Sequence, residues 1–480
     1  MKKGETAIGK LGESMYPDRA YIHREDGKVL IKHVIPFQTV EYVISKKRSS
    51  AAEGRVLRVV DKSPLETESE INVCPHSQSC GGCLYQEINY DNELKIKNGQ
   101  LKQLILSAAK QSFIWEGIKK SPLSKAYRNK MEYSFGDEYK GGSLALGMHK
   151  RGSHYDIVNT DYCNIVNGDF NKILIFTRNF FASENTPYFH KNTRQGFLRH
   201  LVLRCASFTG ELLIALITTD SFGEIKDPNL YDAEPELCKE GELLTEKWKE
   251  GLLALEQNGV LSGKIGGILQ VLNNSYADAV IDQGSRLLYG KNYITETLLK
   301  LEFKISLFSF FQTNSKAAEI LYSTAGEYIG DTKGKLVFDL YSGTGTIAQL
   351  LASYAEHVYG VEIVGEAVKV ARENALRNKI HNCDFLEGDV LKVIDGLSNK
   401  PDIIVLDPPR DGIHPKILPK IGEYIRPPKI IYISCKPSSL ARDLVELQKY
   451  GYRLERACGV DMFPNTPNVE CIALIQRVKS

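Results

Sequence analysis

The sequence has little of several things, and each shortage excludes a class of protein. Ten cysteines among 480 residues are too few for a disulfide-stabilised secreted scaffold. Lys and Arg number 61 against 59 Asp and Glu, so any nucleic-acid footprint must be a local patch. No run of about 18 apolar residues exists, and no apolar stretch follows the N-terminal lysines. These absences predict a reduced, cytoplasmic, globular protein without a secretory signal or a membrane span.

The N-terminal part of the chain has the pattern of a small β-domain. Residues 1–66 hold three runs rich in β-branched residues, KVLIKHVI, TVEYVI and GRVLRVVD, separated by small polar breaks. Closely spaced strands of this kind predict an OB-like β-barrel. SPLETESE, at 63–70, has the composition of a linker.

Two further domains are expected after this linker. A central α+β domain takes in 67–90 and 125–295, and it includes an acidic stretch, Asp232 to Glu250, that we expect to be a solvated surface. From about 300 onward, KLVFDLYSG, HVYGVEI, DIIVLDPP and KIIYISC are short apolar runs separated by helical segments. This alternation predicts a doubly wound, Rossmann-like α/β domain, to which we assign 91–124 and 296–480.

A glycine-rich turn marks a candidate cofactor site. Gly343 and Gly345, in YSGTG, follow a buried strand and lead into an apolar helix, so the backbone can approach a ligand closely. The third glycine of the dinucleotide fingerprint is missing from its usual place, which weakens an NAD interpretation. Glu362 ends the next strand, where a carboxylate can accept ribose hydroxyls, and Asp389 follows a third strand, near where an adenine would lie. The combination resembles the adenosylmethionine methyltransferase fold rather than an ordinary tight turn.

Two strand ends carry residues suited to methyl transfer onto a pyrimidine. Asp407, in DPPRDG, and Cys435, in SCKP, each follow a strand and are expected at the same edge of the sheet. A thiolate there can add to C6 of a uracil and make C5 nucleophilic enough to take a methyl group. Lys436 is the expected local cation that lowers the pKa of this thiol, and Glu470, before the last strand, is the candidate base that removes the C5 proton. A buried structural cysteine and a surface glutamate are the plain alternatives.

Taken together, the motifs are similar to one known family. FFQTN (310–314), DLYSGTG, GVE, DPPR, SCKP and DMFPNTPNVE occur in this order, as in the RNA 5-methyluridine (uracil-C5) methyltransferases, which act on ribosomal or transfer RNA. DMFPNTPNVE has asparagines where the family often has histidines, which we expect to alter local hydrogen bonding only. The resemblance implies S-adenosyl-L-methionine as cofactor and an RNA substrate. It also implies that Gln312 and Asp407 contact the methionine part, that Glu362 holds the ribose, and that Tyr341 is a wall of the cofactor site.

A cysteine cluster forms a second candidate site. Cys74, Cys80 and Cys83 lie in CPHSQSCGGC, and Cys163 follows at a distance. Three close thiolates and a remote fourth suit a tetrahedral metal or an iron–sulfur cube, and spacing alone leaves zinc open. The family resemblance favours a [4Fe-4S] cluster, because some members that act on 23S rRNA carry this arrangement. We expect the cluster to be a structural staple, since methyl transfer needs no electrons.

The expected partner is RNA, with no obligate protein partner and a monomeric chain. The N-terminal barrel resembles the TRAM domain, an RNA-binding module. Basic residues between 125 and 151 alternate with rings that could stack on unpaired bases, namely Tyr127, Tyr133 and Phe135. The cysteine cluster tilts the target towards 23S rRNA over uridine 54 of transfer RNA. Two other functions are open: methylation of an amino group on a base through DPPR, and a non-catalytic RNA-binding or assembly factor. Either function would leave Cys435 and Glu470 without a role.

Overall fold

The computed structural model describes most of the chain, in the ranges 1–47, 51–66, 73–225, 236–277, 279–330, 333–396 and 400–478. The expected linker residues 67–70 and the start of the acidic stretch, 232–235, lie outside these ranges. The chain divides into two compact units. The first unit comprises 1–73, 83–124 and 316–480, and the second comprises 74–82 and 125–315. Within the described ranges, no helix is long and apolar enough to cross a membrane.

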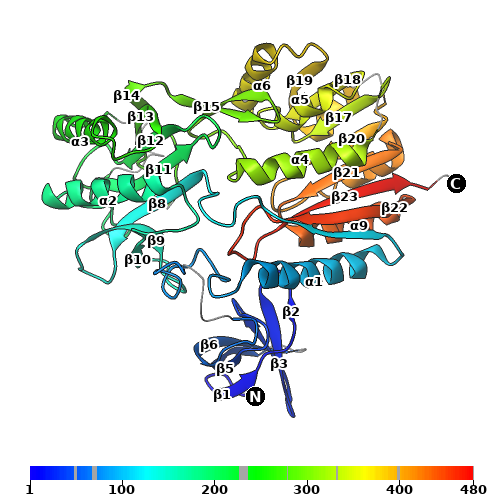
Figure 1. The fold of residues 1–480 in the computed structure, drawn as a ribbon, viewed down its shortest axis with the longest axis horizontal. Helices are drawn as coiled ribbons and strands as arrows, with labels where there is room; N and C mark the ends of the chain where they lie inside the picture. The colour runs from blue at the N-terminus through cyan, green and yellow to red at the C-terminus, as the bar shows by residue number, and fades with distance from the viewer. Residues whose placement is uncertain are drawn as a thin grey trace. The chain divides into compact units, whose positions relative to one another are not determined.

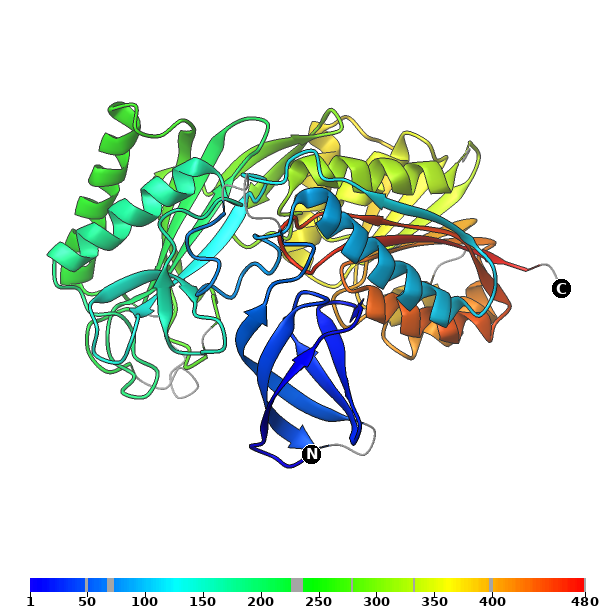
Figure 2. The same cartoon turned by 60° about the horizontal axis from the view of Figure 1, so that its bottom comes forward.

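The first unit begins with a six-stranded sheet in the order β1-β5-β6-β4-β3-β2, which curls around its own core (Figure 2). Its strands are β1 (Thr6–Lys10), β2 (Ser14–Met15), β3 (Arg19–Arg24), β4 (Gly27–Lys32), β5 (Thr39–Lys47) and β6 (Ala52–Asp61). Alternate residues of β4 and β5 are buried, as the period of two in a strand requires. Gly54 allows close packing here, because a Cβ would lie 2.6 Å from the Ile31 side chain. This is the small β-domain predicted from the sequence.

The second unit is built on a seven-stranded sheet in the order β10-β9-β8-β11-β12-β13-β14 (Figure 1). Its strands are β8 (Lys130–Asp137), β9 (Leu144–His149), β10 (Ile157–Asn159), β11 (Leu198–Cys205), β12 (Glu211–Thr218), β13 (Lys264–Leu272) and β14 (Ser285–Gly290). Helices α2 (Gly168–Ser183) and α3 (Lys239–Gln257) pack together, and the Trp248 indole donates to Thr177 at 3.1 Å. The pair β15 (Tyr293–Leu298) and β16 (Leu301–Ser306) completes this α+β unit.

The remainder of the first unit is an eight-stranded sheet in the order β19-β18-β17-β20-β21-β23-β22-β7. Its strands are β7 (Ile114–Lys119), β17 (Leu336–Leu340), β18 (His357–Glu362), β19 (Cys383–Glu387), β20 (Ile403–Leu406), β21 (Lys429–Ser434), β22 (Tyr452–Val460) and β23 (Glu470–Arg477). Strands β17 to β21 are parallel, and β23 runs antiparallel to β21. The strand order reverses direction at β17, and ligands of doubly wound sheets bind at such a point. The predicted Rossmann-like class is therefore confirmed.

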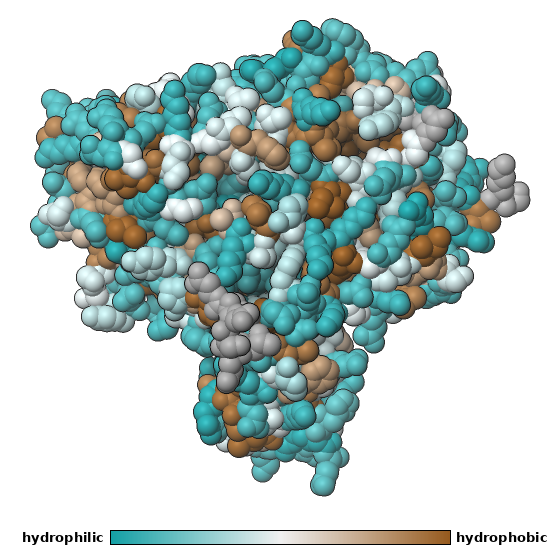
Figure 3. All heavy atoms as spheres, in the orientation of Figure 1, coloured by the Kyte–Doolittle hydropathy of each residue, from teal (hydrophilic) through white to brown (hydrophobic). Residues whose placement is uncertain are grey.

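The helices of this sheet begin where the sequence supplies caps or turns. They are α1 (Tyr90–Ala109), α4 (Ser315–Ile329), α5 (Thr346–Ala352), α6 (Gly365–Arg377), α7 (Val390–Gly396), α8 (Ile417–Pro419), a π-helical turn (Lys420–Ile425) and α9 (Pro437–Gln448). Asn89 caps α1 by accepting from the amide of Asn92 at 2.8 Å, and Pro437 opens α9, where its missing N–H costs nothing. Polar side chains cover most of the face seen in Figure 3, with apolar ones in separate patches.

Candidate active site and cysteine cluster

Most of the predicted site residues gather at one edge of the eight-stranded sheet. Glu362 ends β18, Asp407 directly follows β20, and Cys435 directly follows β21. Because these strands are parallel, their carboxyl ends meet at the same edge. Strand β23 runs the opposite way and pairs Cys471 with Ser434, so the next residues along the two chains, Glu470 and Cys435, are neighbours. A thiol and a carboxyl group are thus brought together from positions that are distant in sequence.

The electrostatics of this pair favour the protonated forms. Glu470 is 1% exposed, and within the described ranges its Oε2 atom has no hydrogen-bond partner. Burial, followed by the charge of Asp407, holds the pKa of Glu470 well above its usual range. Burial also raises the pKa of Asp407 to about 7. The pKa of Cys435 rises to about 11 through burial and the two carboxylates, while Arg410 lowers it. At neutral pH the Cys435 thiol is therefore protonated in the free protein, and burial disfavours the ionised form of Glu470 as well.

The expectation that Lys436 activates the thiol is wrong. Lys436 is exposed at the start of α9, and the cation that lowers the pKa of Cys435 is Arg410. Arg410 belongs to the DPPR segment after β20, one strand away from Cys435 in the sheet. Lys436 is next to Cys435 in the sequence, but the side chains of consecutive residues at a strand end need not point the same way. Proximity in the sequence therefore predicted the wrong cation.

The glycine-rich turn after β17 is shaped by positive φ angles and by Glu362. Tyr341, Gly343 and Gly345 have φ of 74°, 54° and 77°. The amides of Gly343 and Val364 each donate to one carboxylate oxygen of Glu362 at 3.0 Å, which fixes this side chain at the mouth of the turn. A Cβ on Gly345 would lie 2.5 Å from the Phe385 ring, so only glycine fits. The turn presents a rigid carboxylate with lone pairs remaining for further donors.

Two more predicted residues border this turn. Tyr341 is half-buried, and burial raises its pKa to about 12. Asp389 contributes to this rise, so its carboxylate lies near the Tyr341 hydroxyl. Asp389 Oδ1 also caps α7 by accepting from the amide of Leu391 at 2.9 Å. The structural role of Asp389 as a cap thus accompanies its place beside the cofactor turn.

Gln312 is placed differently from the other predicted cofactor residues. It belongs to the second unit, three residues before α4, and its side chain is buried. Its carbonyl oxygen accepts from Asn129 Nδ2 at 3.1 Å. The structure therefore does not by itself bring Gln312 together with Glu362 or Asp407.

Two residues near the site, Asp339 and Tyr16, were not predicted from the sequence to be site residues. Asp339, in β17, is fully buried, and burial together with Asp407 raises its pKa to about 8. Tyr16, in the N-terminal sheet domain, packs against the core of the eight-stranded sheet. Burial raises the pKa of Tyr16 first, and the charges of Glu470 and Cys435 raise it further. Its hydroxyl therefore lies near the thiol–carboxyl pair, although it comes from the other end of the sequence.

A buried ion network holds the loop that precedes Glu470. Lys97, on α1, is 0% exposed, and its ammonium group contacts Asp461 Oδ1 and Glu93 Oε1 at 2.7 Å each. It also donates to the carbonyl of Phe463 at 3.2 Å. The same Glu93 oxygen accepts from the amide of Asn465 at 2.8 Å. Both ends of the loop segment 461–465 are thus fixed to α1 by charge-assisted hydrogen bonds.

The same loop contacts the residues that follow the cysteine motif. The carbonyl of Asn465 accepts from the amides of Leu84 and Tyr85 at 2.9 and 3.0 Å. Asn465 itself has φ of 67°, a left-handed conformation that asparagine tolerates better than most residues. The chain leaving Cys83 is therefore hydrogen-bonded to the loop that carries Glu470.

The predicted metal cysteines are divided between the two units of the chain. Cys74, Cys80 and Cys163 belong to the second unit, and Cys83 begins a segment of the first. Burial raises the pKa of Cys163 to about 11, and the Cys74 and Cys80 sulfurs add to this, so these three thiols are close. In the described part of the chain, however, no group of three His, Cys, Asp or Glu side chains is placed to hold a metal ion.

Two features of these thiols nevertheless suit a group held by thiolates. The amide of Gly82 donates to Cys80 Sγ at 3.4 Å, and the amides of Ile165 and Val166 lower the pKa of Cys163 by hydrogen bonding. The Tyr133 hydroxyl is completely buried and has no hydrogen-bond partner in the described ranges. Burial holds the pKa of Tyr133 well above its usual range, and Cys163 and Cys80 raise it further, so this hydroxyl lies towards the thiols. A buried hydroxyl without a partner calls for an acceptor there.

The predicted stacking rings are not available to RNA. Tyr127, Tyr133 and Phe135 are all buried, so the prediction that their rings stack on unpaired bases is wrong. Tyr133 and Phe135 alternate with polar residues because β8 has the period of two of a half-buried strand, which a sequence cannot distinguish from an RNA-binding pattern.

The chain resembles known proteins over nearly its whole length. Residues 244–478 match the model of a family described as tRNA (Uracil-5-)-methyltransferase. An uncharacterized RNA methyltransferase of Caldanaerobacter subterraneus is 42% identical over 99% of this chain and 100% of its own, and one of Clostridium tetani is 41% identical over 99% of each. The crystal structure of Pyrococcus abyssi tRNA (uracil-54, C5)-methyltransferase in complex with S-adenosyl-L-homocysteine covers 98% of this chain and 100% of its own, with a TM-score of 0.70 and 24% identity.

Proposed function

Since the chain belongs to the RNA uracil-5-methyltransferase family, we propose that it methylates C5 of a uridine in 23S ribosomal RNA, with Cys435 as nucleophile and Glu470 as base. The enzyme is an S-adenosylmethionine-dependent RNA methyltransferase. The observation that carries the proposed roles is the register of β21 and β23, which makes a half-buried thiol and a buried carboxyl group neighbours. Amino-group methylation has no use for such a pair.

The chemistry follows from the proton positions. The Cys435 thiol gives its proton to solvent, and its sulfur forms a bond to C6 of the uracil while the C5–C6 double bond opens and places electrons on C5. The C5 carbon then forms a bond to the methyl group and displaces the uncharged thioether. Glu470, as carboxylate, takes the C5 proton, and the C6–sulfur bond breaks. Because burial raises the pKa of both groups, binding of the substrates would favour their ionised forms, and Arg410 is the cation that assists Cys435.

The cofactor residues are proposed from the same turn. Glu362, which already accepts from the Gly343 amide, would accept the ribose hydroxyls, Asp389 would lie on the adenine side, and Tyr341 and Gly343 would line the approach. Asp407 and Gln312 would contact the methionine part. Bound adenosylmethionine supplies the methyl group as a sulfonium. The positive charge of that group suits the raised pKa of Asp407, since a cation beside it favours its ionised form.

We also propose that Cys74, Cys80, Cys83 and Cys163 hold a [4Fe-4S] cluster, with zinc as the alternative. The amide donors to sulfur and the Tyr133 hydroxyl support a thiolate-held group. Iron and sulfide analysis of anaerobically purified protein should show loss of iron in Cys→Ser variants at each of the four positions. Stoichiometric zinc with no iron, or iron retained in all four variants, would contradict the cluster.

The remaining proposals concern RNA binding, the domain boundaries, the oligomeric state and the place of action in the cell. We propose that the N-terminal sheet domain, 1–66, is a TRAM-like RNA-binding module. The central domain would comprise 67–90 and 125–295, and the methyltransferase domain 91–124 and 296–480. The enzyme would work as a monomer in the cytoplasm, where ribosomal RNA is found.

The decisive experiment traps the covalent intermediate. Protein and adenosylmethionine are incubated with 5-fluorouridine-substituted 23S rRNA or transfer RNA, since fluorine at C5 cannot be removed as a proton. A denaturation-resistant adduct with 23S rRNA, lost in Cys435→Ala and kept in the control Cys238→Ser, is the expected result. Cys238 is a half-buried thiol at the start of α3, in the second unit. An adduct with transfer RNA alone would move the target to transfer RNA, and no adduct with either RNA would overturn the proposed chemistry.

A further inference from the structure

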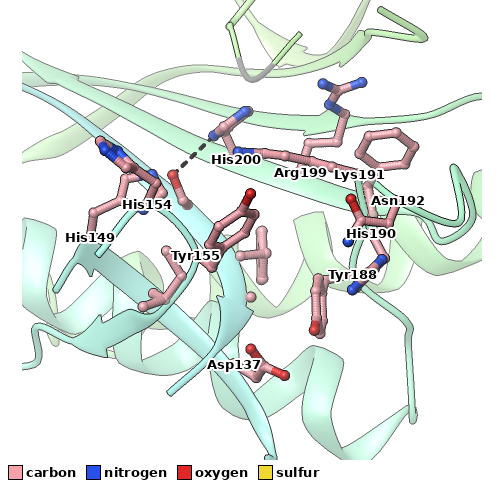
Figure 4. Close-up of a pocket in the computed structure, with 15 residues that line it drawn as sticks. Asp137, His149, His154, Tyr155, Tyr188, His190, Lys191, Asn192, Arg199 and His200 are labelled. Atoms are coloured by element: carbon pink, nitrogen blue, oxygen red, sulfur yellow. Dashed lines mark hydrogen bonds between the residues drawn. The ribbon is translucent and has the colours of Figure 1, made fainter. Parts of the chain in front are cut away.

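The second unit contains a hollow that none of the proposed roles uses. It has a volume of about 610 Å³ including its open mouth, and it lies between β8, the segment before β10 and the segment before β11 (Figure 4). Phe135, Ile157 and Phe189 form its buried wall. His154, Tyr155 and Lys191 form an exposed rim. The hollow thus combines an apolar interior with a polar, partly cationic mouth, as ligand sites do.

The interior of the hollow is closely packed. A Cβ on Gly136 would lie 2.6 Å from the Ile157 side chain, so the floor closes tightly there. The Arg199 guanidinium lies over the Phe189 ring, 4.4 Å from its centroid. Arg199 also donates to the carbonyls of Asn273, Ser275 and Ala277 at 2.6 to 2.8 Å. Arg199 therefore braces the wall and adds positive charge behind it.

The rim offers a ring and a cation to an incoming ligand. Tyr155 is 71% exposed, so its ring is accessible to a ligand. The Lys191 ammonium lies 6.0 Å from the centroid of that ring. Figure 4 shows Tyr155 in the middle of the view, with His154 on one side and His190 on the other. A planar group stacked on Tyr155 would have Lys191 within reach of an attached anion.

The side wall offers a hydrogen-bond acceptor. Burial, followed by the Asp137 carboxylate, raises the pKa of Tyr188 to about 12, so the Tyr188 hydroxyl lies near Asp137. Asp137 Oδ2 accepts from the amide of Gly141 at 2.8 Å, which holds the carboxylate at the wall. Remaining lone pairs of Asp137 can accept from an exocyclic amino group, which adenine, cytosine and guanine carry and uracil lacks.

We propose that this hollow binds one unpaired, amino-bearing nucleotide of the substrate RNA. The base stacks on Tyr155, its amino group donates to Asp137, and its phosphate lies beside Lys191. The proposal rests on the RNA substrate of the enzyme and adds a second base-binding position to the one at Cys435. An RNA-binding site of this kind fixes the strand and selects sequence at a nucleotide that is not modified.

The test measures binding of short single-stranded oligoadenylate, oligocytidylate and oligouridylate to the full-length protein by fluorescence anisotropy. Tyr155→Ala should weaken oligoadenylate binding by about 5- to 100-fold, the range of one lost base stack. Asp137→Asn should reduce the preference for oligoadenylate over oligouridylate. Tyr139→Ala is the matched control, because Tyr139 is 67% exposed in the same unit and does not line the hollow. Unchanged affinity in both Tyr155→Ala and Lys191→Gln would overturn the site.

A second measurement locates the contact and separates this proposal from the proposed function. Photocrosslinking with 8-azidoadenosine in the RNA should label the peptide carrying Tyr155 or Lys191, and labelling confined to other peptides would overturn the site. Tyr155→Ala should still form the 5-fluorouridine adduct at saturating RNA, with a raised KM. Loss of the adduct in wild-type protein would instead reject the role of Cys435 and leave the crosslink to decide the hollow.

Discussion

Replacing Lys97 by Met should destabilise the first unit and release the loop before Glu470. The side chain is completely buried, and its ammonium group contacts carboxylates of Glu93 and Asp461 at 2.7 Å each. Methionine keeps most of the volume and removes the charge, so two carboxylates remain buried without a cation. Removing one partner of a buried ion pair costs about 3–5 kcal/mol. We expect a loss of this size in the free energy of unfolding at pH 8.

The loss of unfolding free energy should depend on pH, and the pKa of Glu93 sets the direction of this dependence. Burial raises the pKa of Glu93 to about 7 from the 4.5 of an exposed glutamate, although Lys97 lowers it. The folded protein therefore binds the proton more tightly than the unfolded chain, and stability falls as pH rises from about 4.5 to about 7. Without Lys97 this pKa rises further, so the window of falling stability extends to higher pH. The Lys97→Met variant should be least impaired near pH 5.

Two tryptophans make the measurement specific. The chain contains only Trp115 and Trp248, and the Trp115 indole donates to Asn98 on α1 at 3.0 Å. In a Trp248→Phe background, urea unfolding followed by fluorescence reports the docking of α1. The control is Lys95→Met on the same helix, whose exposed ammonium donates to the neighbouring Asn92 side chain. A control change within about 0.5 kcal/mol is expected. Equal effects of the two substitutions, or no dependence on pH, would refute the reasoning.

Three further outcomes are expected. Because the pKa of Cys435 is about 11, kcat/KM should rise about tenfold per pH unit from 7 to 9, and Arg410→Gln should lower it throughout; a pH-independent rate would contradict this. Glu470→Gln should reduce turnover by about 10²–10⁴-fold and accumulate a covalent adduct with unmodified RNA on denaturing gels, whereas full turnover would exclude Glu470 as the base. Gly345→Ala should abolish adenosylmethionine binding in calorimetry, since its Cβ meets Phe385 at 2.5 Å, while Gly343→Ala, whose Cβ meets nothing within 4 Å, should weaken binding less. Equal affinities in the two glycine variants would argue against steric exclusion.

Local sequence determined the fold class and the edge of the sheet where the site lies. Runs of Val and Ile ended by Glu362, Asp407 and Cys435 can form parallel strands only if their carboxyl ends share one edge. The glycine-rich turn is equally local, because a positive φ at Gly343 and Gly345 is a property of the residue itself. For these reasons the Rossmann-like domain and the gathering of those three side chains were predictable.

Only the tertiary structure decided which groups surround those side chains. The register of β23 against β21 brings Glu470 beside Cys435, and the sheet order selects Arg410 rather than Lys436 as the neighbouring cation. The rings at 127–135 that were expected to stack on bases are buried in the core. The buried Lys97 contacts a carboxylate that lies 364 positions away in the sequence. Charge, pKa and burial depend on residues that are distant in sequence, and a period of two in a strand does not say which face is covered.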